Sequence, residues 1–143
     1  MNMDIYMFWG KGMRNITKDN IIPYLKEHMP ELKDCDSIVI SQVGEGSQEE
    51  DGDGYVNFIF RIHTDKGNFV LKQGQELART GRDPIAMYRN KLEYDSMRIR
   101  YAIVPEYTPF LKFYDAENNL FVMEDVSTPR IVRFQLNKNR MFA

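Results

Sequence analysis

The residues of this chain best suited to chemistry are two glycines and a lysine that the sequence pattern brings close together. Gly52 and Gly54 lie on a predicted hairpin, in the run Gly-Asp-Gly-Tyr-Val-Asn-Phe-Ile, and Lys72 lies in the strand that follows. Because glycine has no Cβ atom, the backbone N–H groups of such a turn can approach phosphate oxygens closely. A nearby ammonium group would add a charge partner for the same oxygens. The pattern therefore predicts a binding site for the phosphates of a nucleotide.

The acidic residues next to the two glycines favour a different interpretation of the loop. They would repel a phosphate unless they point away from it or a Mg²⁺ ion lies between them. These residues are Glu45, Glu49, Glu50, Asp51 and Asp53. Asn57 also stands where a phosphate loop with three glycines would have its third. Taken alone, the segment is better explained as a solvated acidic hairpin loop.

Lys72 strengthens the phosphate-binding interpretation because its position in an apolar strand requires a partner. Alternation along the strand places Lys72 on the opposite face from Leu71. Its ammonium group then needs solvent, a phosphate or a carboxylate. Glu93, in a predicted helix, could reach across to Lys72 and orient it. The alternative is that Lys72 reaches solvent along the sheet and Glu93 lies on the solvated face of its helix. The order of loop, strand lysine and helix glutamate favours the phosphate site.

The first half of the chain is predicted to form one helix and three strands. Apolar residues three and four apart predict a short helix that begins at Thr17 or, with Pro23 in its first turn, at Asn20. The apolar residues are Ile21, Leu25, Met29 and Leu32. Alternating β-branched and aromatic segments predict strands over residues 37–43, 55–63 and 68–73, joined as an antiparallel meander.

The second half is predicted to form a long helix and a hairpin. Asp83-Pro84 provides an N-cap followed by proline at the first helical position. The expected apolar stripe of this helix consists of Ile85, Tyr88, Leu92, Ser96 and Ile99. Residues 110–114 and 120–126 are predicted strands separated by a polar turn. The predicted fold class is therefore α+β, a five-stranded antiparallel sheet with one long packed helix.

Composition restricts the class of protein. A chain of 143 residues with 43% hydrophobic content can form a single core. A net charge of -2, with interspersed signs, predicts neither a nucleic-acid nor a membrane partner. Cys35 is the only cysteine, which fits a reducing compartment, and the apolar run 5–9 is too short for a signal or a membrane span. We therefore expect a cytoplasmic protein.

No second cluster of catalytic or metal-binding residues is predicted. His28 and His63 have no companions at ligand spacing, and no Ser/His/Asp set can be assembled. Glu124 and Asp125, at the end of the last predicted strand, are the only carboxylates near the expected nucleotide edge and give weak support for a metal. The sequence thus predicts no catalytic residue and no metal ligand within this chain.

Beyond these patterns, about Thr17 to Arg133 resembles a known family. The similar segments are 53–61, 70–73, 92–93, 122–127 and 131–133. They resemble the small lobe of methylthioribose kinases, within the aminoglycoside phosphotransferase and choline kinase-like group that shares the protein-kinase fold. The loop of that family reads D-G-N-x-N, which would account for Asn57. The acidic run 45–51 departs from the family pattern.

The resemblance implies an ATP-binding lobe and particular contacts. It implies nucleotide contacts from Asn57 and Lys72, and adenine contacts from the segment Glu124 to Val126. Together with the loop residues, the candidate nucleotide-binding residues are Gly54, Tyr55, Asn57, Lys72, Glu124, Asp125 and Val126. The implied reaction is transfer of the ATP γ-phosphate to the 1-hydroxyl of 5-methylthioribose, in methionine salvage.

The resemblance also implies an organisation in which part of the site lies elsewhere. The catalytic Asp, the Mg²⁺-binding acids and the sugar-binding residues of the family would lie beyond Ala143. We therefore expect an N-terminal appendage over 1–16, the lobe over 17–126, and the hinge and start of a missing second lobe over 127–143. Such a chain should not catalyse phosphoryl transfer by itself. It should self-associate through its uncovered inter-lobe edge. The alternative is a stand-alone, non-catalytic module for nucleotide sensing or protein interaction.

Overall fold

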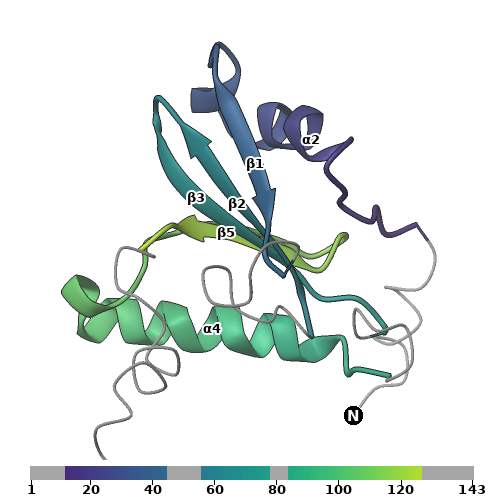
Figure 1. The fold of residues 1–143 in the computed structure, drawn as a ribbon. Helices are drawn as coiled ribbons and strands as arrows, with labels where there is room; N and C mark the ends of the chain where they lie inside the picture. Colours follow the sequence, from purple (N-terminus) through teal and green to yellow (C-terminus); the bar gives the residue numbers. More distant parts are fainter. Residues whose placement is uncertain (1–11, 45–55, 78–83, 127–143) are drawn as a thin grey trace, which may run out of the picture.

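A five-stranded antiparallel sheet is the centre of the fold. The computed structural model describes residues 12–44, 56–77 and 84–126 (Figure 1). The strands are β1 (Ile38–Gln42), β2 (Phe58–Thr64), β3 (Gly67–Gln73), β4 (Leu111–Asp115) and β5 (Leu120–Glu124). Their order in the sheet is β1-β2-β3-β5-β4. The predicted α+β class and five-stranded sheet are confirmed.

Strands β1 to β3 form the predicted meander. The β2–β3 register runs from Phe58↔Gln73 to Thr64↔Gly67, and the chain reverses through a tight turn at Asp65. Gly67 has φ +131, a conformation that glycine adopts without steric cost. β5 then pairs with β3, with Leu71 opposite Val122, so the second hairpin completes the sheet on that side.

The first helix packs as its apolar spacing predicts. Helix α2 (Ile21–His28) has Asn20 at its N-cap and is followed by the 3₁₀ helix η1 (Pro30–Leu32). The helix therefore begins after Asn20, and the alternative start at Thr17 is wrong. Asn20 Oδ1 instead accepts a hydrogen bond from Thr17 N at 2.8 Å. The four apolar residues of the stripe are all buried.

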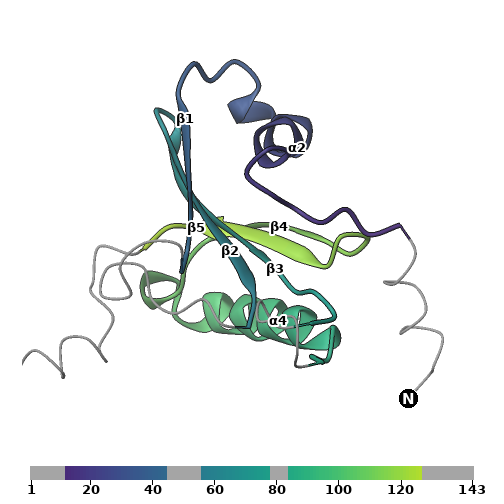
Figure 2. The same cartoon turned by 45° about the vertical axis from the view of Figure 1, so that its right-hand side comes forward.

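The main core lies between α2 and one face of the sheet. Ile62, Leu71 and Val122 are fully buried there against α2 and η1. Ile16, which precedes the helix, belongs to the same cluster and is only 2% exposed. The other face of the sheet carries alternate residues, and helix α4 (Tyr88–Ile103) covers part of it (Figure 2). The two helices thus lie on opposite sides of the sheet.

The long helix starts later than the sequence predicts. Pro84 forms an isolated antiparallel bridge with Leu77, and Ile85 N donates to Glu76 O at 2.8 Å. Because these residues pair with the segment after β3, they are extended, and α4 begins at Tyr88. A short 3₁₀ helix, η2 (Pro105–Tyr107), follows α4.

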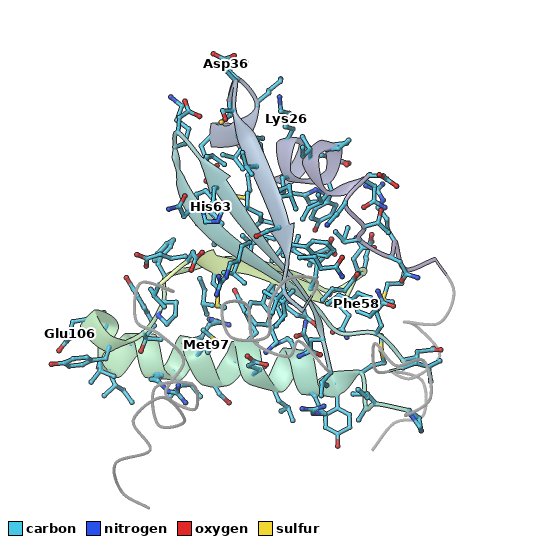
Figure 3. The ribbon with its side chains drawn as sticks, viewed as in Figure 1. Lys26, Asp36, Phe58, His63, Met97 and Glu106 are labelled. Atoms are coloured by element: carbon cyan, nitrogen blue, oxygen red, sulfur yellow. The ribbon has the colours of Figure 1, made fainter. Side chains whose placement is uncertain are left out.

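The face that α4 presents to the sheet is also different from the predicted one. Leu92 and Ile99 of the predicted stripe are 56% and 65% exposed. Met97 lies on the side of α4 that faces the sheet (Figure 3). Tyr94, one turn earlier on that side, packs against Phe121 with the two rings tilted and their centroids 5.7 Å apart. Aromatic and polar contacts, rather than the aliphatic stripe, therefore set the rotation of the helix.

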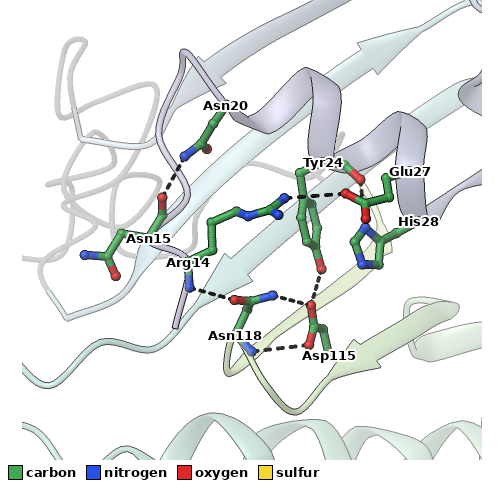
Figure 4. A network of polar contacts seen from close by, with 8 residues as sticks. All are labelled: Arg14, Asn15, Asn20, Tyr24, Glu27, His28, Asp115 and Asn118. Carbon is green, nitrogen blue, oxygen red and sulfur yellow. Dashed lines mark hydrogen bonds and ion pairs between the residues drawn. The ribbon is translucent and has the colours of Figure 1, made fainter. Parts of the chain in front are cut away.

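Polar contacts join α2 to the β4–β5 turn (Figure 4). Tyr24 Oη donates to Asp115 Oδ2 at 2.7 Å, and Asn118 Nδ2 donates to the same oxygen at 2.7 Å. Arg14 N donates to Asn118 Oδ1 at 2.7 Å, so the segment before α2 is held at the same turn. This network ties the first helix to the last hairpin.

No helix within the described ranges has the length and hydrophobicity needed to cross a membrane.

Candidate functional site

The central pair of the candidate site is Lys72 and Glu93. Strand alternation places Leu71 in the α2 core and Lys72 on the opposite face, toward α4, as predicted. Lys72 Nζ lies 2.6 Å from both Oε1 and Oε2 of Glu93. The side chains are 16% and 39% exposed, respectively. The structure therefore brings together the two residues that the sequence predicts to interact.

This arrangement orients the ammonium group and keeps it able to bind an anion. A lysine ammonium has three N–H donors, and the Glu93 carboxylate accepts two of them. Among the described residues no other acceptor is recorded for the third donor. Because both side chains are anchored on regular elements, β3 and α4, the position of Nζ is set by the packing of the helix on the sheet.

A buried asparagine controls that packing. Asn119, in the β4–β5 turn, has φ +47 and no exposed surface. Its Nδ2 donates to Gly74 O at 3.2 Å and to Met87 O at 3.0 Å. Asn90, on α4, donates from Nδ2 to Asn119 O at 2.7 Å. Asn119 thus joins the end of β3 to the beginning of α4, next to Lys72.

Gly74 is required for the close approach of these groups. A Cβ atom at Gly74 would lie 2.8 Å from Asn119 Nδ2 and 3.1 Å from Asn90 Cβ. Gly74 N also donates to Asn119 O at 3.1 Å. The sequence analysis missed this network. Its only signal was a glycine directly after β3 and an asparagine in a turn, which does not reveal that the two meet.

Tyr114 completes the network and remains a hydrogen-bond donor at neutral pH. Its Oη donates to Asn119 Oδ1 at 3.1 Å. Burial, together with the nearby carboxylates of Asp95 and Asp115, raises the pKa of Tyr114 to about 12. The phenol is therefore protonated throughout the physiological range. Asn90 Oδ1 is the buried side-chain atom within the described ranges that has no hydrogen-bond partner.

Of the predicted phosphate-binding loop residues, the structure describes only Asn57. Gly54 and Tyr55 lie outside the described residues. Asn57 is partly buried and directly precedes β2, two residues before Ile59, which pairs with Lys72. Because side chains alternate along a strand, the spacing places Asn57 toward the Lys72 face of the sheet.

The three residues predicted to meet adenine differ in what their backbones offer. Glu124 N donates to Phe110 O at 2.8 Å, and Asp125 N donates to Asn68 O at 3.0 Å. Both N–H groups are therefore used within the fold. Val126 N makes no hydrogen bond with the described residues, and Val126 is 48% exposed. Of the three, only Val126 offers a backbone donor to a ligand.

An apolar side chain, Val70, lies between Lys72 and this strand end. Val70 shares a face with Lys72, is 8% exposed and pairs with Met123 of β5. The sequence analysis did not select Val70, although its two-residue spacing from Lys72 was a usable signal. No three Asp, Glu, His or Cys side chains within the described ranges are grouped to hold a metal ion.

The comparisons with known proteins indicate a kinase-like domain. No protein-family model matches the chain. The chain is distantly similar to proteins described as methylthioribose kinases from Bacillus mycoides (strain KBAB4), Bacillus thuringiensis (strain Al Hakam) and Bacillus cereus (strain AH820). Each is 27% identical over 124 residues, which cover 85% of this chain and 29% of the relative. The chain thus spans less than a third of the length of the curated relatives it matches.

Proposed function

We propose that residues 17–126 are the ATP-binding lobe of a small-molecule kinase and that 127–143 begin the connection to a second lobe. The observation that carries this proposal is the ion pair between Lys72 and Glu93, with Nζ 2.6 Å from both carboxylate oxygens. A strand lysine oriented by a helix carboxylate is the arrangement with which kinase-type folds hold the phosphates of ATP. The partial similarity to methylthioribose kinases supports the same conclusion.

The proposed nucleotide lies along the Lys72 face of the sheet. Its phosphates bind the free N–H donor of Lys72 and the loop that contains Gly54, Tyr55 and Asn57. Its adenine ring lies toward the strand end, beyond Val70, and accepts from the Val126 N–H. This orientation follows from the order of groups along β3 and β5, because Lys72 pairs with Phe121 while Val70 pairs with Met123, nearer Val126.

The proposed reaction is phosphoryl transfer from ATP to a sugar hydroxyl, with 5-methylthioribose as the proposed acceptor. The acceptor oxygen bonds to the γ-phosphorus, the bond from that phosphorus to the β,γ-bridging oxygen breaks, and ADP leaves. The hydroxyl proton passes to a general base. The described residues supply positioning and charge for the phosphates. The base and the Mg²⁺ ligands are proposed to lie outside them.

Isothermal titration calorimetry with ATP tests the binding part of the proposal. The described residues form one wall of a cleft, so we expect a Kd on the order of 0.1–1 mM. Lys72→Ala should weaken binding at least roughly tenfold, because it removes the ammonium group that faces the phosphates. Lys112→Ala is the matched control, since Lys112 is another strand lysine in an ion pair, with Glu31 Oε1 at 2.8 Å.

The results separate the proposal from its alternatives. Equal losses of ATP affinity in Lys72→Ala and Lys112→Ala would indicate nonspecific attraction of ATP to positive charge. That result would contradict a specific binding site at Lys72. Micromolar affinity would contradict the one-walled cleft. Phosphorylation of methylthioribose by the purified chain, abolished by Lys72→Ala, would show that the general base lies within it. Specific ATP binding without any transfer is the expected outcome.

A further inference from the structure

A small open hollow lies between α4 and the beginning of β4. Its volume is about 180 Å³. It is lined by three residues of α4 and two at the beginning of β4: Tyr94, Arg98, Tyr101, Phe110 and Leu111. Because β5 separates β4 from β3 in the sheet, none of these residues belongs to the candidate nucleotide site around Lys72. We call this feature the aromatic hollow.

The size and walls of the aromatic hollow suit one aromatic ring. Tyr101 and Phe110 already meet edge to face there, with ring centroids 5.7 Å apart, and Phe110 is 47% exposed. A further ring could contact them in the tilted geometries that aromatic pairs prefer. In other proteins an apolar cavity of about 150 Å³ binds a benzene molecule. The aromatic hollow therefore has room for a single ring and little more.

Arg98 gives the aromatic hollow a positive charge that the described residues do not neutralise. Its side chain is exposed, and it forms no ion pair within the described ranges. Asp95, the carboxylate nearest in sequence, is held by Lys91, whose Nζ lies 2.5 Å from both of its oxygens. A guanidinium group binds a carboxylate through two parallel N–H donors. The charge at this position thus favours an anionic ligand.

We propose that the aromatic hollow binds a small aromatic carboxylate. The ring enters the hollow beside Tyr101 and Phe110, and the carboxylate accepts hydrogen bonds from the Arg98 guanidinium. An uncharged aromatic molecule would leave Arg98 without an acceptor. A carboxylate without a ring would leave the apolar walls in water. The site therefore selects for both groups in one molecule.

Saturation-transfer NMR with phenylacetate and the full chain tests the proposal. For so small a ligand in an open hollow we expect a Kd on the order of 1–10 mM. Phenylacetamide has the same shape but no charge, so it should bind roughly fivefold more weakly. Acetate, which has no ring, should not displace phenylacetate at the same concentration.

Arg98→Gln should weaken phenylacetate binding roughly fivefold and leave phenylacetamide binding unchanged, because only the carboxylate contact is removed. Arg100→Gln is the matched control. Arg100 is also an exposed arginine of α4 without an ion pair in the described ranges, but it does not line the hollow. Phe110→Leu should weaken the binding of both ligands, because it removes a ring from the wall. Circular dichroism checks that each variant remains folded.

Four results would overturn the proposal. Equal losses in Arg98→Gln and Arg100→Gln would indicate diffuse attraction to positive charge. Equal affinities of the unmodified chain for phenylacetate and phenylacetamide would remove the role of Arg98. Displacement of phenylacetate by ATP would place it in the nucleotide site. No phenylacetate signal at concentrations well above the expected Kd would show that the aromatic hollow binds no such ligand.

Discussion

The interaction between Lys72 and Glu93 is the feature on which nucleotide binding should depend most. A carboxylate that accepts two N–H groups keeps the lysine extended from the sheet, and the amide of a glutamine would hold it less well. The role of Glu93 is therefore to orient Lys72. Its contribution to ATP affinity should vanish when Lys72 is replaced.

We expect Glu93→Gln to weaken ATP binding roughly fivefold, about 1 kcal/mol, because one charge-assisted contact is replaced by a weaker one. Calorimetry of the single variant, of Lys72→Ala and of the double variant forms the test. The double variant should bind no more weakly than Lys72→Ala. Additive losses would mean that Glu93 contributes independently of Lys72.

Gly74→Ala should reduce stability and disturb the site together. The added Cβ meets Asn119 Nδ2 at 2.8 Å, so the β4–β5 turn or the start of α4 must move. We expect a loss of about 1–3 kcal/mol in the free energy of unfolding, measured by urea denaturation. ATP binding should weaken as well, because α4 carries Glu93. Unchanged affinity in the folded variant would show that the asparagine network does not position the lysine pair.

Among the helices, α4 shows how packing overrides an apolar pattern. Its aliphatic residues face outward, while Tyr94, Asn90 and Glu93 make the contacts with the sheet and its turn. The helix is held by directional contacts to partners distant in sequence. Substitutions on the face that packs on the sheet should therefore lower stability more than substitutions of the exposed aliphatic residues, which is the reverse of what the apolar spacing predicts.

Tyr94→Ala should lower the free energy of unfolding by about 2–4 kcal/mol, because the ring packs against both Tyr114 and Phe121. Ile99→Ala, at a side chain that is 65% exposed, should cost less than about 0.5 kcal/mol. Urea unfolding of the two variants measures both values. A larger loss for Ile99→Ala would mean that the opposite face of α4 packs on the sheet.

The contact between α2 and β4 should make stability depend on pH at both extremes. Burial alone would raise the pKa of Asp115, but hydrogen bonds from Tyr24 and Asn118 outweigh it and lower the pKa below the ordinary 3.8. Burial and the Asp115 carboxylate raise the pKa of Tyr24 above its ordinary 10.0. The Asp115 contribution is present above 3.8 and is lost as pH falls through the lowered pKa. The Tyr24 contribution is present below 10.0 and is lost as pH rises through the raised pKa.

Asp115→Asn should therefore flatten the acid side of the stability profile. Urea midpoints measured at intervals from roughly pH 5 to pH 2 should fall less steeply in this variant than in the unmodified chain. The variant should also be less stable at neutral pH, since the charged acceptor of Tyr24 is lost. Identical acid slopes in the two proteins would assign the pH dependence to other carboxylates.

At the scale of the whole molecule, the end of β5 exposes apolar side chains through which copies of the chain can associate. Val126 and Phe110 are 48% and 47% exposed, and they lie near the edge proposed to face a second lobe. We expect the chain to self-associate through this edge, with an apparent mass in light scattering that rises with concentration. Val126→Asp should reduce that rise, whereas Val39→Asp, on β1, should not. A monomer at every concentration would contradict this expectation.

Local patterns were sufficient to predict much of this protein. Strand alternation placed Leu71 and Lys72 on opposite faces, turn residues marked the hairpins, and apolar spacing identified the buried side of α2. These features depend on residues within a few positions of one another. The contact between Lys72 and Glu93 was also predictable, because a lysine in an apolar strand needs a nearby partner.

The rotation of α4, the asparagine network and the free donor at Val126 could not be predicted in this way. Each depends on groups that are distant in sequence: Tyr94 against Phe121, Gly74 against Asn119, and Asp125 N bonded to Asn68 O. A helix with apolar residues on one side and aromatic and polar residues on the other has two possible packing faces. The partners on the sheet select between them, because buried donors and acceptors must be paired and ring surfaces must be covered.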